Sequence, residues 1–144
     1  MQPRISLITL AVTDLERAKS FYEETLGWPS APSPPGIVFF DLNGLILSLY
    51  PHADLVQDYG GEECPANSSG FTLAHNVGSA TEVDALFARL RSHGATILKP
   101  PQKAFWGGYS GYFQDPDGHR WEIAHNPFWT IMSDGRISMQ PTPQ

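Results

Sequence analysis

The first half of the chain opens with an apolar stretch that is followed by an amphipathic one. Residues 5–12 are mostly apolar and predict a strand. The next stretch, residues 15–26, carries apolar side chains at the spacing of one helix face, namely Leu15, Ala18, Tyr22 and Leu26. Asp14 is a favourable N-cap, and Gly27 is a favourable residue just beyond a helix C-terminus. The pattern therefore predicts a helix that begins after Asp14 and ends before Gly27.

The second half repeats this order of elements. Residues 70–77 predict a strand, and Ser79 with Glu82 has the spacing of a capping box. Apolar side chains then recur at the spacing of one helix face, namely Val83, Leu86, Phe87 and Leu90. Gly94 follows this stretch as Gly27 follows the first. The repeat indicates two copies of one structural unit.

Short strand-like segments follow each predicted helix. In the first half they are Trp28, residues 36–42 and residues 45–50. In the second half they are residues 95–98, 109–114 and 119–124. Asn43-Gly44 and residues 115–118 supply the turns. Each half thus predicts a βαβββ module, so we expect an α+β fold in which two modules form one curved, partly closed mixed sheet with helices outside.

The length of 144 residues fits one domain, residues 1–144. Its expected parts are module 1 (5–50), a linker (51–69), module 2 (70–126) and a C-terminal tail (127–144). The linker is polar and glycine-rich. Residues 99–108 contain two prolines and two aromatic residues and predict a loop near the open mouth of the sheet.

Charge and cysteine content exclude several classes of function. Lys and Arg number 9 against 15 Asp and Glu, a formal net charge of −6, which disfavours nucleic acid and membrane surfaces as partners. The single cysteine, Cys64, cannot form an internal disulfide or a cysteine-rich zinc site. The apolar run at residues 5–12 is too short for a spanning helix and is followed by acidic residues, so we expect a cytoplasmic protein.

Two segments carry a family resemblance. They are Ile8 to Tyr22 with Leu26-Gly27, and Gly107 to Pro127, supported by Phe71 to Val77. Together they resemble the vicinal oxygen chelate superfamily, which includes glyoxalase I, fosfomycin- and bleomycin-resistance proteins and extradiol dioxygenases. The resemblance touches both modules and implies a U-shaped cavity on the concave face of the sheet. It does not specify a reaction, because this fold hosts several chemistries.

The resemblance also implies where a metal would bind. In that superfamily four side chains on the concave face chelate one divalent metal, one from the first and one from the last strand of each module. Carried onto this sequence, these positions are Leu7, Ser48, Thr72 and Glu122. Leu7 has no donor atom and the two hydroxyls are weak ligands, so only Glu122 keeps a strong ligand type. We therefore expect no cofactor, and a divalent metal only through rearranged ligands.

Strand alternation limits which residues can replace the lost ligands. Side chains two apart share a face, so Tyr50 and His52 join Ser48. His75, His119 and His125 have the opposite parity to the ligand positions of their strands. His52 with Glu122 is thus the remaining metal pair, although His52 lies at or past the end of its strand.

Five further residues are candidates for ligand binding, and each also has a purely structural interpretation. Phe105 and Trp106 either close over an apolar ligand or pack their own loop. Tyr109 and Tyr112 either line the cavity or serve as amphipathic wall residues. Glu122 is the candidate general base or acceptor for a ligand donor. The alternatives are a structural carboxylate paired with Arg120 or with a hydroxyl such as Ser48 or Thr72, or a relic of an ancestral metal site.

Three functions remain open. The first is a metal-free protein that binds a small, largely apolar molecule by burial. It is favoured because Leu7, Ser48 and Thr72 stand at positions where the family has metal ligands. The second is a metal-dependent lyase or dioxygenase with rearranged ligands. The third is a metal-free isomerase or lyase in which Glu122 moves a proton next to a carbonyl. We expect a homodimer, because the family often pairs modules across a twofold axis.

Overall fold

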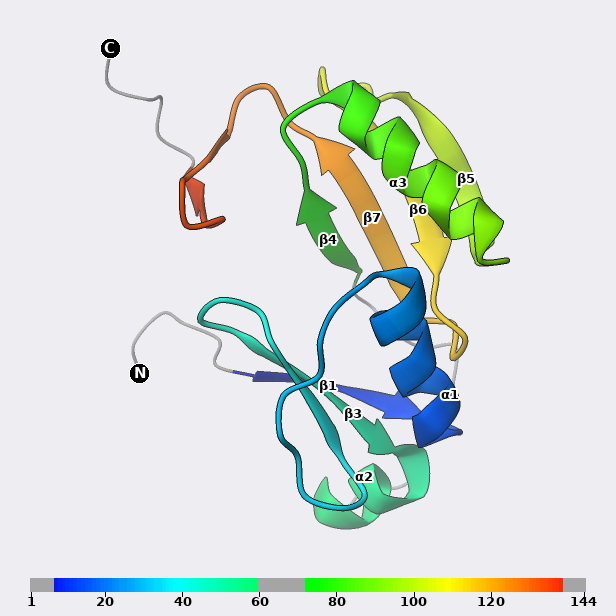
Figure 1. Cartoon of the computed structure of the whole chain (residues 1–144). Helices are drawn as coiled ribbons and strands as arrows, with labels where there is room; N and C mark the ends of the chain where they lie inside the picture. Colours follow the sequence, from blue (N-terminus) through cyan, green and yellow to red (C-terminus); the bar gives the residue numbers. More distant parts are fainter. Residues whose placement is uncertain (1–6, 60–71, 139–144) are drawn as a thin grey trace. The chain divides into compact units, whose positions relative to one another are not determined.

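The computed structural model describes residues 7–59 and 72–138 (Figure 1). The chain forms two compact units. Unit 1 comprises Met1–Ser69 with the turn Pro116–Gly118, and unit 2 comprises Gly70–Asp115 and His119–Gln144. Cys64 and most of the predicted linker lie outside the described residues.

Unit 1 contains a three-stranded sheet and helices. Its elements are β1 (Leu7–Val12), α1 (Leu15–Ser20), the π-helical turn η1 (Phe21–Thr25), β2 (Val38–Asp41), β3 (Ile46–Pro51) and α2 (His52–Tyr59). The strand order is β1-β3-β2, with β1 parallel and β2 antiparallel to β3. The strand-like piece expected at Trp28 is not formed, and the isolated bridge in this segment joins Ala31 to Phe39.

Local sequence signals set the ends of these elements as predicted. The Asp14 carboxylate accepts a hydrogen bond from the Arg17 amide at 3.0 Å and caps α1. Gly27 takes a left-handed φ of 76° directly after the helix. Asn43 and Gly44 both have positive φ, 59° and 100°, as a two-residue hairpin of the expected kind requires.

The core of unit 1 lies between one sheet face and the first helix. Alternate strand residues are buried on that face, namely Leu10, Val12, Phe40, Leu47 and Leu49. Ala18 and Tyr22 are also fully buried, and the Tyr22 ring lies 5.6 Å from that of Phe40. The other sheet face is left for Thr9, Ser48 and Tyr50.

The expectation of an irregular linker directly after residue 50 is wrong, because residues 52–59 form α2. This helix has eight residues, which is shorter than the window in which helical periodicity is recognisable. It contacts β3 and β1 and half-buries Leu55 and Val56.

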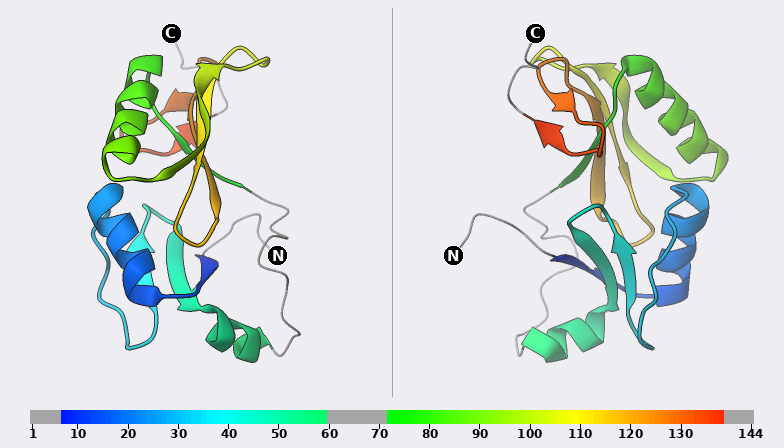
Figure 2. Two further views of the ribbon diagram at one scale, coloured as in Figure 1. Left: turned by 90° about the vertical axis from the view of Figure 1, so that its right-hand side faces the viewer. Right: turned by 60° about the vertical axis from the view of Figure 1, so that its left-hand side comes forward.

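Unit 2 contains a four-stranded sheet, one long helix and a small hairpin. Its elements are β4 (Leu73–Asn76), α3 (Ala80–Ser92), β5 (Thr96–Lys103), β6 (Tyr109–Gln114), β7 (Arg120–His125), β8 (Thr130–Ile131) and β9 (Ile137–Ser138). The strand order is β4-β7-β6-β5, with β4 parallel to β7 and the other pairs antiparallel. Two views in Figure 2 show α3 along one face of this sheet. The α+β class is confirmed, but the expected single sheet is not formed: among the described residues the strands of each unit pair in a sheet of their own.

The predicted capping box and core of α3 are also present. The Ser79 hydroxyl accepts from the Glu82 amide at 3.2 Å and donates to the Glu82 carboxylate at 3.1 Å. Val83, Phe87 and Leu90 are buried at helical spacing. They occupy the sheet face that also buries Phe113, Trp121 and Ile123.

The first half of the expected loop at residues 99–108 is strand. β5 continues to Lys103, and only residues 104–108 form the turn before β6. The prolines at 100 and 101 are tolerated because β5 is an edge strand and its pairing with β6 shifts register between Lys99 and Gln102, where the prolines lie.

Among the described residues, no helix is long and apolar enough to cross a membrane.

We predict that Gly111→Ala destabilises unit 2. A Cβ atom at Gly111 would lie 2.5 Å from the buried Phe87 ring and 2.9 Å from the Lys99 carbonyl oxygen. The expected loss is about 1–3 kcal/mol of unfolding free energy, measured by urea denaturation. Gly78→Ala is the matched control, because its Cβ would meet only the flexible end of Glu82 at 3.1 Å. Equal stability of the two variants would contradict this packing.

Candidate functional site

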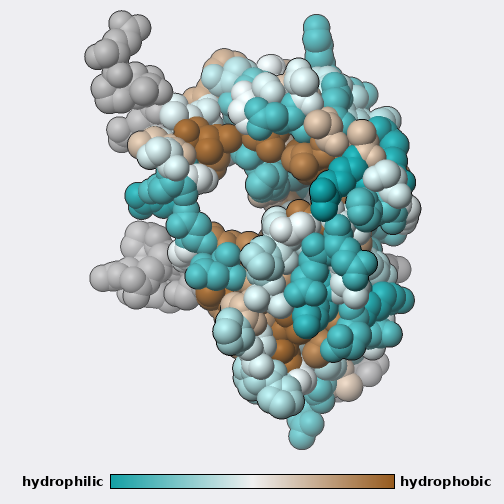
Figure 3. Space-filling model, viewed as in Figure 1, coloured by the Kyte–Doolittle hydropathy of each residue, from teal (hydrophilic) through white to brown (hydrophobic). Residues whose placement is uncertain are grey.

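Surface polarity alone does not locate a site. Hydrophilic and apolar residues are interspersed over the visible face of each unit (Figure 3). Ser48 in unit 1 and Glu122 in unit 2 lie on the sheet face that does not carry α1 or α3, so each unit contributes its own group of side chains.

In unit 1 the predicted ligand position on β3 is occupied by a buried hydroxyl that pairs with a half-buried one on β1. Ser48 is fully buried and donates a hydrogen bond to the Thr9 hydroxyl at 2.7 Å. The parallel register places Thr9, not Leu7, beside Ser48. Leu7 pairs with Ile46 at the start of the described strand and is 44% exposed. Thr9 was not predicted, although it shares strand parity with Leu7.

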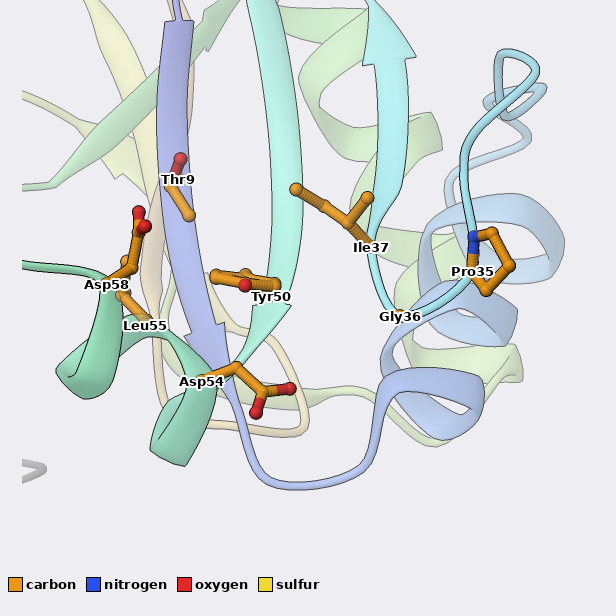
Figure 4. A pocket seen from close by; sticks show the side chains of 8 residues that line it. All are labelled: Thr9, Pro35, Gly36, Ile37, Tyr50, Asp54, Leu55 and Asp58. Carbon is orange, nitrogen blue, oxygen red and sulfur yellow. The ribbon is translucent and has the colours of Figure 1, made fainter.

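A pocket of about 330 Å³ lies next to this pair. Its residues come from β1, β3, α2 and the segment before β2: Thr9, Pro35, Gly36, Ile37, Tyr50, Asp54, Leu55 and Asp58. Figure 4 shows Tyr50 between the α2 side chains and Ile37. Of the two residues expected to share a face with Ser48, Tyr50 lines this pocket and His52 is not among the described residues of its lining. The polar contribution of α2 was missed, because this helix was not predicted.

In unit 2 the site-facing residues form a row across the sheet. Glu122 on β7 is paired with Ala74 on β4 and Tyr112 on β6, and Tyr112 is paired with Lys99 on β5. Residues paired in register share a face, so these side chains lie on the same side. Burial and then the charge and hydrogen bond of Glu122 raise the pKa of the Tyr112 phenol. Thr72 precedes β4 and is exposed.

Tyr109 is separated from Tyr112 by the sheet itself. Its hydroxyl donates to the Asp84 carboxylate of α3 at 2.8 Å, and this hydrogen bond is the main cause that raises the pKa of Tyr109. Tyr109 therefore lies on the helix face, away from Glu122, which differs from the expectation that both tyrosines line one cavity. Two residues that are three positions apart on a strand have side chains on opposite faces. The sequence alone could therefore have shown that Tyr109 and Tyr112 do not share a face.

The aromatic residues of the turn before β6 have different environments. Phe105 is fully exposed and does not pack its loop. The Trp106 ring covers Gly108, where an added Cβ would lie 1.8 Å from the ring. Trp106 thus packs its own turn, in line with the structural alternative for that residue.

The histidines expected on the other face make structural contacts. His119 Nδ1 lies 2.7 Å from the buried Asp115 carboxylate, and His125 Nδ1 lies 3.2 Å from the Val77 carbonyl oxygen. His75 is paired with Ile123, a core residue on the α3 side.

The donor atoms of these residues do not fit a divalent-metal cage. Leu7 has no donor, the Ser48 hydroxyl already donates to Thr9, and Thr72 is an exposed hydroxyl, so Glu122 is the one strong ligand among the four positions. Within residues 7–59 and 72–138, no three His, Cys, Asp or Glu side chains converge as a metal group would require.

The fold and this arrangement define an α+β protein whose two units each present polar side chains on the sheet face opposite a helix. The Glyoxalase/Bleomycin resistance protein/Dioxygenase superfamily profile matches residues 4–123, and the chain belongs to this superfamily.

Several relatives support this assignment. A metallothiol transferase FosB from Lysinibacillus sphaericus is 30% identical over 121 residues, which is 83% of this chain and 79% of that protein. A glyoxalase-related enzyme from Fulvimarina pelagi is 39% identical in its crystal structure, with a TM-score of 0.88 over 95% of this chain and 98% of that one. A glyoxalase/bleomycin resistance protein/dioxygenase from Nocardioides is 30% identical, with a TM-score of 0.74 over 87% and 84% of the two chains.

We predict that Glu122→Gln lowers the pKa of Tyr112. The substitution removes the negative charge that opposes ionisation of the phenol, whereas burial remains, so the pKa should fall but stay above the ordinary tyrosine value. Tyrosine Cζ resonances followed by carbon-13 NMR against pH measure this. Tyr109 is the internal control, because its partner is Asp84. An unchanged Tyr112 titration would show that the two side chains do not interact.

Proposed function

We propose that this protein binds a small organic molecule without using a metal ion. The observation that carries the proposal is the Ser48–Thr9 hydrogen bond, at the position where the family resemblance places a metal ligand of module 1. A fully buried hydroxyl that donates to a neighbouring hydroxyl is a structural group, since it has no charge to offer a cation. The pocket beside it supports binding by partial burial of a ligand.

The pocket changes the expected character of the ligand. A largely apolar molecule was expected because the lost ligands make the cavity more apolar. The lining described in unit 1 combines apolar Ile37 and Leu55 with polar Thr9, Asp54 and Asp58. An amphipathic ligand therefore suits this pocket better than a wholly apolar one.

A second candidate function is metal-free proton transfer by Glu122. Its contact with Tyr112 favours it, because a carboxylate beside a phenol supplies both a base and a hydrogen-bond donor on one sheet face. A metal-dependent lyase or dioxygenase activity with rearranged ligands is less consistent with the residues present. A cytoplasmic location is part of the proposal.

We predict that the purified protein binds no divalent metal stoichiometrically at the Glu122 position. Calorimetry with zinc, nickel, manganese and iron(II) should show no one-to-one binding tighter than about 10 µM, because one carboxylate and hydroxyls form too weak a cage. Glu122→Ala is the matched control and should give the same trace as the unaltered protein. One ion per chain that is lost in Glu122→Ala would overturn the metal-free proposal.

We also propose that the chain forms a homodimer through its C-terminal tail. The tail exposes large apolar side chains that are costly to leave in water, namely Phe128, Trp129, Ile131, Met132 and Ile137. Association of two such surfaces buries them symmetrically.

We predict that Phe128→Asp lowers the dimer fraction. Phe128 is 66% exposed, so the substitution leaves the interior of unit 2 unchanged while it places a charge in an apolar interface. Light scattering coupled to size exclusion measures the mass. Ala88→Asp, on the exposed side of α3, is the control and should remain dimeric. A monomeric unaltered protein, or a fully dimeric Phe128→Asp variant, would contradict the tail as the interface.

A further inference from the structure

We propose that the unit 1 pocket selects an organic cation, a molecule with an ammonium or guanidinium group on a short apolar or aromatic body. This inference rests on the proposed small-molecule binding and specifies the class of ligand. The pocket volume of about 330 Å³ is at the small end of the range for ligand sites, so the ligand is small.

The pocket has an apolar part and a charged part. Tyr50 and Thr9 extend from neighbouring strands, α2 supplies one wall, and residues 35–37 supply another (Figure 4). Tyr50, Ile37 and Leu55 give apolar surface that would be dehydrated by the body of a ligand. The Tyr50 ring face also attracts a cation that rests on it.

The charged side chains that line the pocket are both acidic. Asp54 and Asp58 are four residues apart on α2, so both carboxylates lie on the same helix face about one turn apart. Among residues 7–59 and 72–138, the side chains that line the pocket include no Lys, Arg or His. Within the described residues neither carboxylate forms an ion pair. The pocket therefore repels anions and offers two unneutralised acceptors to a cationic head group.

The apolar part of the lining argues for an organic cation over a metal ion. A hard divalent cation needs about six oxygen ligands, whereas this pocket provides two carboxylates, a hydroxyl and a phenol. Such an ion would also make no contact with the apolar side chains of Ile37, Leu55 and Pro35. An amine on an aromatic body uses both halves of the pocket.

Three probes that differ mainly in charge test this inference: tyramine, neutral 4-ethylphenol and anionic 3-(4-hydroxyphenyl)propionate. Amide chemical shifts in an NMR titration give both the dissociation constant and the location. We expect tyramine to bind most tightly, to shift the amides of Tyr50 and Leu55, and to weaken when salt rises from about 50 mM to about 500 mM.

Variants of the pocket give the second arm of the experiment. Asp54→Asn and Asp58→Asn should each weaken tyramine about two- to fivefold, the range for exposed charge pairs. Tyr50→Leu should weaken it while Tyr50→Phe retains binding through the ring. Glu24→Gln is the matched control, because it removes one exposed charge of the same unit outside the pocket lining.

The outcomes distinguish this inference from the proposed function. Equal binding of all three probes, shifts that map outside the pocket, or binding of calcium in place of tyramine would overturn the organic-cation inference. None of these results would bear on the metal calorimetry, which tests the metal-free proposal. Stoichiometric metal binding lost in Glu122→Ala would overturn that proposal even if tyramine bound in unit 1 as expected.

Discussion

The alternation of side chains across the two sheets is the constraint on which the rest of the structure depends. Each sheet gives one face to a helix: Leu10 and Leu47 face the α1 side in unit 1, and Phe113 and Ile123 face the α3 side in unit 2. Because successive strand residues point to opposite faces, the remaining side chains have nowhere else to lie. The same rule that builds the core therefore decides which polar groups are available for chemistry.

Much of the fold was predictable because its signals are local. A cap such as Asp14 and a turn such as Asn43-Gly44 act within a few residues, so sequence spacing alone specifies them. α2 and the length of β5 were not predictable in the same way. A two-turn helix carries too few residues to show periodicity, and the prolines of β5 are acceptable only because its position in the sheet leaves one side unpaired.

The candidate site was only partly predictable, for a related reason. The identity of Glu122 and Ser48 followed from the family resemblance, but their partners depend on strand register. The turn at residues 115–118 fixes the register of the β6–β7 hairpin, whereas no local signal fixes that of the parallel pair β1 and β3. Register places Thr9 beside Ser48 and Tyr112 beside Glu122. Tyr109 and Tyr112 lie on opposite faces of β6. The alternation of side chains along one strand was enough to predict this separation.

The buried hydroxyl of Ser48 and the acidic pocket have different physical consequences. The Ser48 hydroxyl carries no charge, and its hydrogen bond to Thr9 satisfies it, so it leaves no buried charge in unit 1 that a cation would have to neutralise. Asp54 and Asp58 instead lie at the exposed rim on α2, where water solvates them and little stability is lost. Two exposed carboxylates on α2 destabilise the folded state little and remain available to a ligand. We therefore assign the selectivity for a cationic ligand to α2, and not to the positions where the family resemblance places metal ligands.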